Sequence, residues 1–427
     1  MIDKEDTERI IALIQQEVVP AIGCTEPMAV ALCTARATEQ LGRRPDSIEV
    51  FLSANVLKNA MGVGIPGTGM IGLPIAISLG ALIGKSEYQL EVLRDLTPSA
   101  LEEGKQYVQE KHIAIHLKEN ISEKLYIEVR CSSKGDSATA IISGGHTRFV
   151  YIGQSSTVPE NISSSIEICE RDEIQLNMQM VYDFATTAPL EKLRFILLTR
   201  DYNMRAANDA LKGNYGHNLG KTIDRPLSKG IFGNSIFSHI IAKTASACDA
   251  RMGGAMIPVM SNSGSGNQGI CATNPVAVFA EENENTEEEL IRALTLSHLT
   301  AIYIKQSLGC LSALCGCVVA GIGSSVGITL LMGGDYGHVC RSVKNMIANL
   351  TGMICDGAKP SCSLKIASGV STAVLSALLS MEGKCVTSAE GIVDDSVDKS
   401  IHNLTSIGAE AMNATDEMVL NIMTNKC

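Results

Sequence analysis

The fold of this chain is decided by residues 112–153, which read HIAIHLKENISEKLYIEVRCSSKGDSATAIISGGHTRFVYIG. Four short runs, IAIHL, LYIEVRC, ATAIISG and TRFVYIG, are separated here by turn residues. Short runs rich in β-branched and aromatic residues, bounded by turn residues, are typical of strands. The stretch therefore predicts a small sheet, mixed or antiparallel, to which Ile48–Leu52 adds a further strand.

The pattern on both sides of this stretch is helical. Residues 6–19 carry an apolar stripe at Ile10, Leu13, Ile14 and Val18, and a second helix is expected from Pro27 to Leu41. Gly-rich loops and an apolar helix follow to about residue 83, and after about residue 172 the chain is rich in helical patterns. We therefore expect an α+β fold with two regions. Residues 1–171 carry the sheet, and residues 172–427 form a large, mainly helical region.

Composition narrows the class of protein. The chain has 427 residues, a net charge of −11, 4% aromatic residues and no Trp. Scattered basic residues build neither a phosphate-binding stripe nor a base-stacking surface, so nucleic acid is not expected as a partner. The first residues, MIDKEDTERI, are too charged for a secretory signal. The 14 cysteines are therefore expected to be thiols or metal ligands in a reducing cytoplasm.

Three stretches contain no Asp, Glu, Lys or Arg: residues 59–84, 252–280 and 306–334. Each is long enough to cross a bilayer. They are rich in Gly, Ser, Asn and Pro, however, and lipid would leave the backbone amides of such loops without partners. We expect no membrane span. These stretches are predicted to line one buried, uncharged cavity, and the alternative is that they are core helices.

Cysteines cluster in two segments. Residues 309–317 read GCLSALCGC and residues 354–362 read ICDGAKPSC. This spacing matches neither a ferredoxin nor a zinc finger, and buried thiols are the simplest alternative. If three of these cysteines held a four-iron cluster, one iron would lack a protein thiolate and would be open to substrate as a Lewis acid.

Cys24 stands apart from these clusters, in PAIGCTEP at residues 20–27. It directly precedes the second predicted helix, where Thr25 is a candidate cap and Glu26 suits the first turn. Free amides and the helix dipole at this position would favour a thiolate, which is able to accept a proton. The alternative is a thiol buried in a loop.

Six segments together carry a resemblance to a known family: PAIGCTEP, SANVLKNAMGVGIPGTG, ACDARMGG, SNSGSGNQG, LCGC and ICDGAKPSCSLK. They resemble the L-cysteine desulfidase family, which is related to the α-chain of iron–sulfur L-serine dehydratases. The resemblance extends from about residue 5 to residue 425. It implies a 4Fe–4S cluster with three cysteine ligands and a cysteine as general base.

Carried over to this chain, the resemblance makes Cys24 the base and Cys355 and Cys362 two of the ligands. Cys315 is the best match for the third, with Cys310 and Cys317 as alternatives. The C-terminal Cys427 is either a plug for the open iron or an unimportant terminal residue. His146, in GGHT, is expected in a turn, and a contact with substrate is the alternative.

Elimination also needs groups that hold the substrate carboxylate. Backbone amides and side chains of the Gly/Ser/Asn loop, with an Asn/Lys motif upstream, are candidates. They are Asn55, Lys58, Asn59, Ser261, Asn262, Ser263, Gly264 and Asn267. Asn and Ser at such positions are equally suited to cap the backbone.

The expected activity is the conversion of L-cysteine to pyruvate, ammonia and hydrogen sulfide. Alternatives are an iron–sulfur L-serine or L-threonine dehydratase, a pyridoxal phosphate lyase using Lys58, Lys359 or Lys365, a non-catalytic iron–sulfur redox sensor, and a transporter. A small amino acid is the expected ligand. A homodimer is expected from base rates.

Overall fold

The computed structural model describes residues 3–119, 121, 123–155, 174–309 and 312–425. In these residues a small sheet lies in the N-terminal half and helices make up nearly all of the C-terminal half, which confirms the predicted α+β class. The helices and strands of the first part are α1 (Lys4–Glu17), β1 (Pro20–Ile22), α2 (Thr25–Leu41), β2 (Ser47–Leu52), α3 (Ala54–Ala60), α4 (Leu73–Leu82), η1 (Ser86–Glu91), α5 (Pro98–Gln109), β3 (Ile113–Leu117), β4 (Tyr126–Ser133), β5 (Asp136–Ser143) and β6 (Phe149–Gly153).

The main sheet has the strand order β3-β2-β4-β5-β6. Each of the five strands predicted from sequence is present. Strands β2, β4, β5 and β6 pair antiparallel, while β2 and β3 are parallel. The parallel pair follows from chain order, because α3, α4 and α5 form a crossover between β2 and β3. One face of the sheet packs on α2, with Ile127 and Val129 fully buried.

The two predicted N-terminal helices are present with shifted starts. Asp3 caps α1 by accepting a hydrogen bond from the Asp6 amide, and Ile10 and Ile14 are fully buried. The second helix begins at Thr25 rather than Pro27, because Cys24 itself is the N-cap residue in extended conformation. Pro27 is accommodated within the first turn. The helix ends at Gly42, whose φ of 74° suits the left-handed C-cap.

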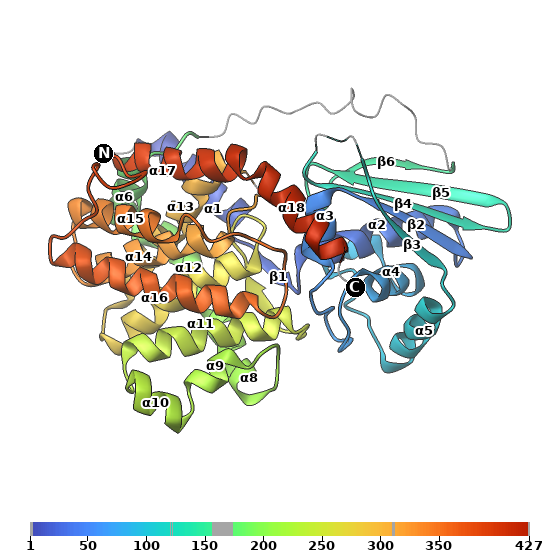
Figure 1. Ribbon diagram of the computed structural model, residues 1–427, viewed down its shortest axis with the longest axis horizontal. Coiled ribbons are helices and arrows are strands. Elements are labelled where there is room, and N and C mark those ends of the chain that lie inside the picture. The colour runs from blue at the N-terminus through green and yellow to red at the C-terminus, as the bar shows by residue number, and fades with distance from the viewer. Residues whose placement is uncertain (1–2, 120, 122, 156–173, 310–311, 426–427) are drawn as a thin grey trace.

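Helices of the second part pack around α14 (Gly316–Leu331), which contacts α12, α13, α15 and α16. Figure 1 shows these helices as one body beside the sheet. The remaining elements are α6 (Met178–Thr187), α7 (Leu190–Leu193), η3 (Arg194–Ile196), α8 (Leu197–Lys212), α9 (Leu219–Ile223), α10 (Pro226–Phe232), α11 (Ile236–Met252), β7 (Pro258–Met260), α12 (Gly266–Glu282), α13 (Glu287–Leu308), α15 (Tyr336–Leu350), α16 (Cys362–Met381), α17 (Val397–Ser406), η4 (Ile407–Ala411) and α18 (Asn413–Thr424).

Two large hydrophobic clusters form the core. One lies between the sheet, α2 and α4, and the other lies among the helices of the C-terminal part. Ile10 and Ile14 of α1 belong to the helical cluster although they come first in the chain. At the other end of the chain, α18 lies against α3 beside the sheet (Figure 1). Both termini thus pack across the predicted boundary at residues 171/172, and the division into domains stays a prediction.

The three uncharged stretches contribute both core helices and loops. Their helical parts are α4, α12 and α14, whose residues are almost all buried against other elements. Among the described residues, one helix, α16, has the length and apolar composition of a membrane span, and half of the corresponding window is buried inside the molecule. Asn59 of α3 and the loops before α12 and α14 border a cavity. The prediction that this cavity is uncharged is wrong, because Glu17, Glu26 and Lys305 from other segments also line it.

Candidate active site

A two-stranded ribbon brings the Cys24 segment to the Gly/Ser/Asn loop. Strand β1 pairs antiparallel with β7, with Pro20 opposite Met260 and Ile22 opposite Pro258. Cys24 follows β1 after a single residue, Gly23, and Ser261 directly follows β7. The Thr25 hydroxyl also donates a hydrogen bond to the Gly264 carbonyl at 3.2 Å. Two motifs that lie more than 230 residues apart in sequence therefore form one site.

The centre of this site is a buried pair formed by Cys24 and Glu26. The Cys24 thiol donates to Oε2 of Glu26 at 3.0 Å, and the Thr25 hydroxyl donates to the same oxygen at 3.0 Å. Asn59 holds the other oxygen through its Nδ2 at 3.1 Å. Thr25 thus binds the carboxylate rather than capping the helix as its position in the sequence suggested.

Electrostatics favour a thiol at Cys24 rather than the thiolate expected from its place at a helix start. Burial and the negative charge of Glu26 raise the pKa of Cys24 well above its ordinary value, and the more distant Arg251 guanidinium only partly offsets this. Burial alone would raise the pKa of Glu26. His146, the hydrogen bond from Cys24 and Arg251 outweigh that effect and hold it below the ordinary value. The helix dipole does not overcome a carboxylate in direct contact.

A cavity of about 600 Å³ lies beside this pair. Its wall includes groups from both halves of the chain, namely Glu26, Asn59, His146, Ser263, Gly264, Ser265, Gln268, Gly316 and Cys355. Within the described residues, two buried polar atoms of this wall have no hydrogen-bond partner: Oδ1 of Asn59 and Nε2 of His146. Buried polar atoms are normally paired, so such atoms in a cavity wall suggest a place for a polar ligand.

The predicted carboxylate-binding loop divides into a structural part and a cavity part. Ser261 donates to the Val19 carbonyl at 2.7 Å, and Asn262 donates to Nδ1 of His298 at 3.1 Å, so both are used within the fold. Ser263 and Gly264 border the cavity. Both have positive φ, 46° and 77°, which turns the chain into Ser265, the N-cap of α12. Oδ1 of Asn267 is buried without a partner in the described part of the chain.

Arg251, at the end of α11, lies behind this loop and was not singled out from the sequence. Its side chain is only 3% exposed, and its Nε has no hydrogen-bond partner among the described residues. A Cβ on Gly266 would meet this Nε at 2.3 Å, so a larger residue at the start of α12 would displace the Arg251 side chain. A buried cation at a helix N-terminus makes the loop electropositive, which suits a carboxylate.

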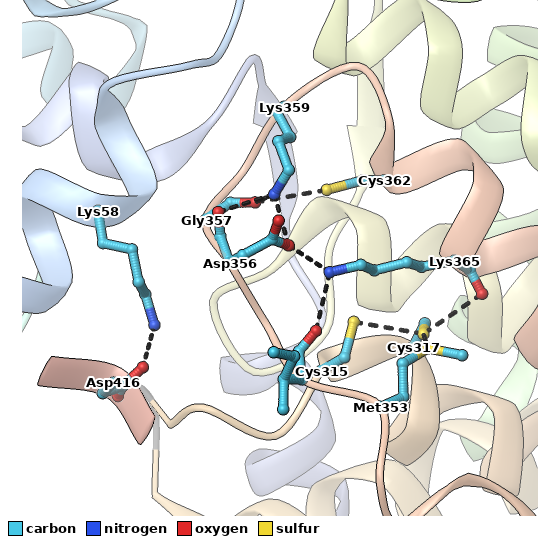
Figure 2. A network of polar contacts seen from close by, with 11 residues as sticks. Lys58, Cys315, Cys317, Met353, Asp356, Gly357, Lys359, Cys362, Lys365 and Asp416 are labelled. Carbon is cyan, nitrogen blue, oxygen red and sulfur yellow. Dashed lines mark hydrogen bonds and ion pairs between the residues drawn. The ribbon is translucent and has the colours of Figure 1, made fainter. Parts of the chain in front are cut away.

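Of the upstream residues, only Asn59 reaches the cavity. Asn55 and Lys58 face the other way, towards α18, where both bind the carboxylate of Asp416. The Asn55 contact is 2.9 Å, and Lys58 is 1% exposed. Figure 2 shows the Lys58 side chain directed at Asp416. Asp416 therefore already occupies the two groups expected to grip substrate.

Backbone pairing brings the two cysteine segments together. Leu314 and Ile354 form an antiparallel bridge, and the Cys355 amide donates to the Ala313 carbonyl at 2.6 Å. Cys315 is the N-cap of α14, and Cys362 is the first residue of α16. Figure 2 shows Cys315 and Cys362 beside the loop that carries Asp356 and Gly357. The three predicted ligands thus come from three adjoining chain segments.

Cys315 and Cys317 differ in their surroundings. The Cys317 thiol donates to Sγ of Cys315 at 3.3 Å and also lies 3.1 Å from the sulfur of Met353. This hydrogen bond lowers the pKa of Cys315 to about 7, while the pKa of Cys317 is raised well above its ordinary value. Thiolates are the form that binds metal. This contrast in pKa favours Cys315 over Cys317 as the third ligand. Cys310, the other alternative, and Cys427 lie outside the described residues.

The surroundings of Cys355 and Cys362 favour thiolates less than those of Cys315 do. Burial raises the pKa of Cys355 to about 11 and also raises that of Cys362, but each lies close enough to the other and to Cys315 for their charges to interact. Lys359 and Lys365 stand beside them, both paired with Asp356. Among the described residues, no group of three His, Cys, Asp or Glu is placed to bind a single metal ion. A four-iron cluster spreads its ligands over separate irons, so three thiols gathered near one cavity fit that group better than a single ion.

The sequence missed Glu26 and Asp416 as partners of predicted site residues, and it missed Gln268 and Arg251 as parts of the site. A signal for Glu26 was available, since it is the only charged residue between Glu17 and Arg36. His146 lies between β5 and β6, as a turn residue would, and it also lines the cavity, the alternative that the sequence left open.

Fold and site together define an α+β protein whose cavity is bordered by Cys355, by amide side chains and by the buried Glu26, which Cys24 contacts from behind the cavity wall. The family described as the serine dehydratase alpha chain matches residues 87–421, well over half of the sequence. This chain therefore belongs to the serine dehydratase alpha chain family, as the sequence resemblance implied at the level of this wider group.

Several curated relatives match along their whole length. The UPF0597 protein of Phocaeicola vulgatus is 66% identical over 100% of this chain and 99% of its own. The UPF0597 protein of Bacteroides thetaiotaomicron is 65% identical with the same coverage. The UPF0597 protein of Porphyromonas gingivalis is 54% identical over 99% of this chain and 100% of its own.

Proposed function

We propose that this protein is an iron–sulfur-dependent lyase that converts L-cysteine to pyruvate, ammonia and hydrogen sulfide. The observation that carries the proposal is the cavity. Glu26, the partner of Cys24, lies in its wall, and so does Cys355, one of the three clustered cysteines. A proton-transfer group and a candidate metal group facing one small cavity suit an elimination, in which a Cα proton and a β-substituent leave together.

Cys315, Cys355 and Cys362 are proposed to hold a 4Fe–4S cluster. When bound, such a cluster would supply a Lewis-acidic iron that stabilises the departing sulfur. The neighbouring Lys359 and Lys365 are paired with Asp356, and Lys58 is paired with Asp416. This pairing leaves none of these three lysines free to form a Schiff base, which weighs against a pyridoxal phosphate lyase.

The protein groups around the cavity divide the remaining tasks. Cys24 takes the Cα proton. The backbone amides of Ser263–Ser265, at the N-terminus of α12 and in front of Arg251, bind the substrate carboxylate. Oδ1 of Asn59 and Nε2 of His146, which have no hydrogen-bond partner among the described residues, bind the substrate ammonium or the leaving group. The aminoacrylate released then tautomerises and hydrolyses in water without further help.

The second candidate is an iron–sulfur L-serine or L-threonine dehydratase, which the family description favours. Both reactions would use the same groups and differ in the atom that leaves. A sulfur is a soft ligand and a hydroxyl is a hard one, so the metal environment decides between them. A redox sensor remains the candidate of another class. A sensor would use the three cluster cysteines, but it would give the Cys24–Glu26 pair and the cavity no role.

The test is a side-by-side assay of the full-length protein, purified without oxygen and reconstituted with iron and sulfide. We expect sulfide and pyruvate in equal amounts from L-cysteine, only after reconstitution, together with the absorbance of a thiolate-ligated cluster. Pyruvate from L-serine alone would favour the dehydratase. A cluster without any turnover would favour the sensor. A homodimer in the cytoplasm belongs to the same proposal and is tested by sedimentation and by cell fractionation.

A further inference from the structure

Glu26 is held in place more firmly than a surface carboxylate. It is 7% exposed and Cys24 is 2% exposed. Three hydrogen bonds from Cys24, Thr25 and Asn59 fix both of its oxygens, and it also lies in the cavity wall. A carboxylate desolvated to this degree is costly to the fold. The contact of Glu26 with Cys24, the proposed base, therefore calls for a functional explanation.

The charges that face this pair come from three elements. Besides Cys24 and Glu26 on α2, they are His146 in the turn between β5 and β6 and Arg251 at the end of α11. Together these groups keep Glu26 ionised and Cys24 protonated. A protonated thiol has no free lone pair with enough basicity to remove a Cα proton. If Cys24 is the base, its own proton must first have somewhere to go.

We propose that Glu26 is the proton acceptor of Cys24 and the acid that protonates the leaving group. As the Cα–H bond breaks, its proton passes to Sγ of Cys24 while the thiol proton passes to Oε2 of Glu26. The Cα electron pair forms the C=C bond as the Cβ–S bond breaks. Glu26 then returns its proton to the departing sulfide. Both protein groups end as they began, and a free thiolate never accumulates.

This inference rests on the proposed function, since it assigns a role in the same elimination. The test uses the reconstituted holoenzyme and the variant Glu26→Gln, which keeps the shape of the side chain and removes its charge and basicity. We expect kcat for L-cysteine to fall by a factor on the order of 10² to 10⁴, the usual contribution of a proton-transfer group. Glu26→Asp, which keeps a carboxylate on a shorter stem, should retain more activity than Glu26→Gln.

A second readout separates this role from a structural one. Iodoacetamide reacts with thiolates, so the rate at which it modifies Cys24, read by mass spectrometry, follows the thiolate fraction. In Glu26→Gln the repelling charge is gone and this rate should rise at fixed pH, about tenfold for each unit by which the Cys24 pKa falls. The thiolate thus becomes more abundant while turnover becomes slower. A purely structural or electrostatic role for Glu26 does not predict these opposite directions.

The outcomes are distinguishable. Wild-type turnover in Glu26→Gln overturns the proposal. So does a variant in which turnover rises together with Cys24 reactivity. If Glu26→Gln stays active while His146→Gln loses turnover, the proton passes through His146 instead. If Glu26→Gln does not fold, Glu26→Asp decides, because wild-type kcat despite the displaced carboxylate contradicts a direct transfer. Absence of turnover in the wild-type enzyme removes the proposed function and this inference together.

Discussion

At the scale of single residues, the candidate site depends on hydrogen bonds between residues that lie far apart in the sequence. The local sequence around each residue does not indicate its partner. His298 is one example. It is fully buried on α13, accepts a hydrogen bond from Nδ2 of Asn262 at 3.1 Å, and places Nε2 3.0 Å from the Thr273 hydroxyl. The acceptor role of Nδ1 puts the proton on Nε2. A neutral imidazole therefore holds the cavity loop against the helical body.

His298 predicts a pH dependence of stability. Burial lowers the pKa of His298 from 6.5 to about 3. Between these values the unfolded chain binds the proton and the folded protein does not, so the free energy of unfolding decreases as pH falls from about 6.5 to about 3. The loss amounts to about 5 kcal/mol at most. In His298→Asn this part of the dependence should vanish, as measured by urea unfolding at several pH values. An unchanged slope would contradict a neutral, buried His298.

The cysteines give a second prediction at this scale. Replacing Cys315, Cys355 or Cys362 by Ala should lower the iron content of the reconstituted protein, because each would remove one of three ligands. Cys317→Ser should keep most of the iron, since Cys317 donates to Cys315 in this structure. Cys340→Ser, on α15, is the matched control for loss of a thiol. Full iron content in Cys355→Ala would refute the ligand assignment.

At the scale of elements, close packing of α12 against β7 places the loop between them. Gly269 lies in the first turn of α12, and a Cβ there would stand 2.0 Å from the Met260 carbonyl oxygen. This contact is with backbone, which cannot move aside without shifting β7 and its partner β1. The geometry of the Cys24 segment is therefore coupled to one glycine about 245 residues away.

Gly269→Ala is accordingly predicted to lower the free energy of unfolding by about 1–3 kcal/mol or more, the usual cost of overpacking. It should also weaken substrate binding, because the loop that borders the cavity moves. Gly230→Ala, in α10, is the control, as a Cβ there meets nothing within 4 Å. Chemical denaturation and KM measured for both variants check the prediction. Equal stability of the two variants would show that α12 and β7 are not packed so closely.

At the scale of the whole molecule, the two hydrophobic cores are joined by both ends of the chain. Helix α1 packs into the helical core, and α18 leaves that core to lie on α3. The ion pair of Lys58 with Asp416 stabilises the contact between α3 and α18. The side chains of Lys58 and Asp416 are 2% and 13% exposed. The pair stands beside the proposed cluster loop, since the charge of Lys58 acts on Cys355.

Breaking this pair on one side should therefore destabilise the protein strongly. Asp416→Ala leaves a buried ammonium without its partner, and such losses amount to about 3–5 kcal/mol. Lys58→Met alone should cost a similar amount, while the double variant should recover part of the loss. A double-mutant cycle by urea unfolding measures the coupling. Additive effects of the two substitutions would mean that α18 does not rest on this contact.

The sequence by itself determined the fold class, the five strands of the main sheet and the segments that meet at the site. Strand alternation, apolar helical stripes and unusual glycine and cysteine spacing depend on local chemistry and are readable in one dimension. Membership in the serine dehydratase alpha chain family was likewise implied by motifs alone, and the comparison with that family supports it.

Only the tertiary structure decided which side chains face one another. It assigned Asn59 to Glu26 but Asn55 and Lys58 to Asp416, although all three lie on one short helix. It also made Cys24 a thiol, because a carboxylate in contact and a buried setting outweigh the dipole of a helix start. The physical reason is the same in both cases. Side-chain pairing and desolvation depend on groups from distant parts of the chain. The local sequence does not indicate which of these groups will approach a given side chain.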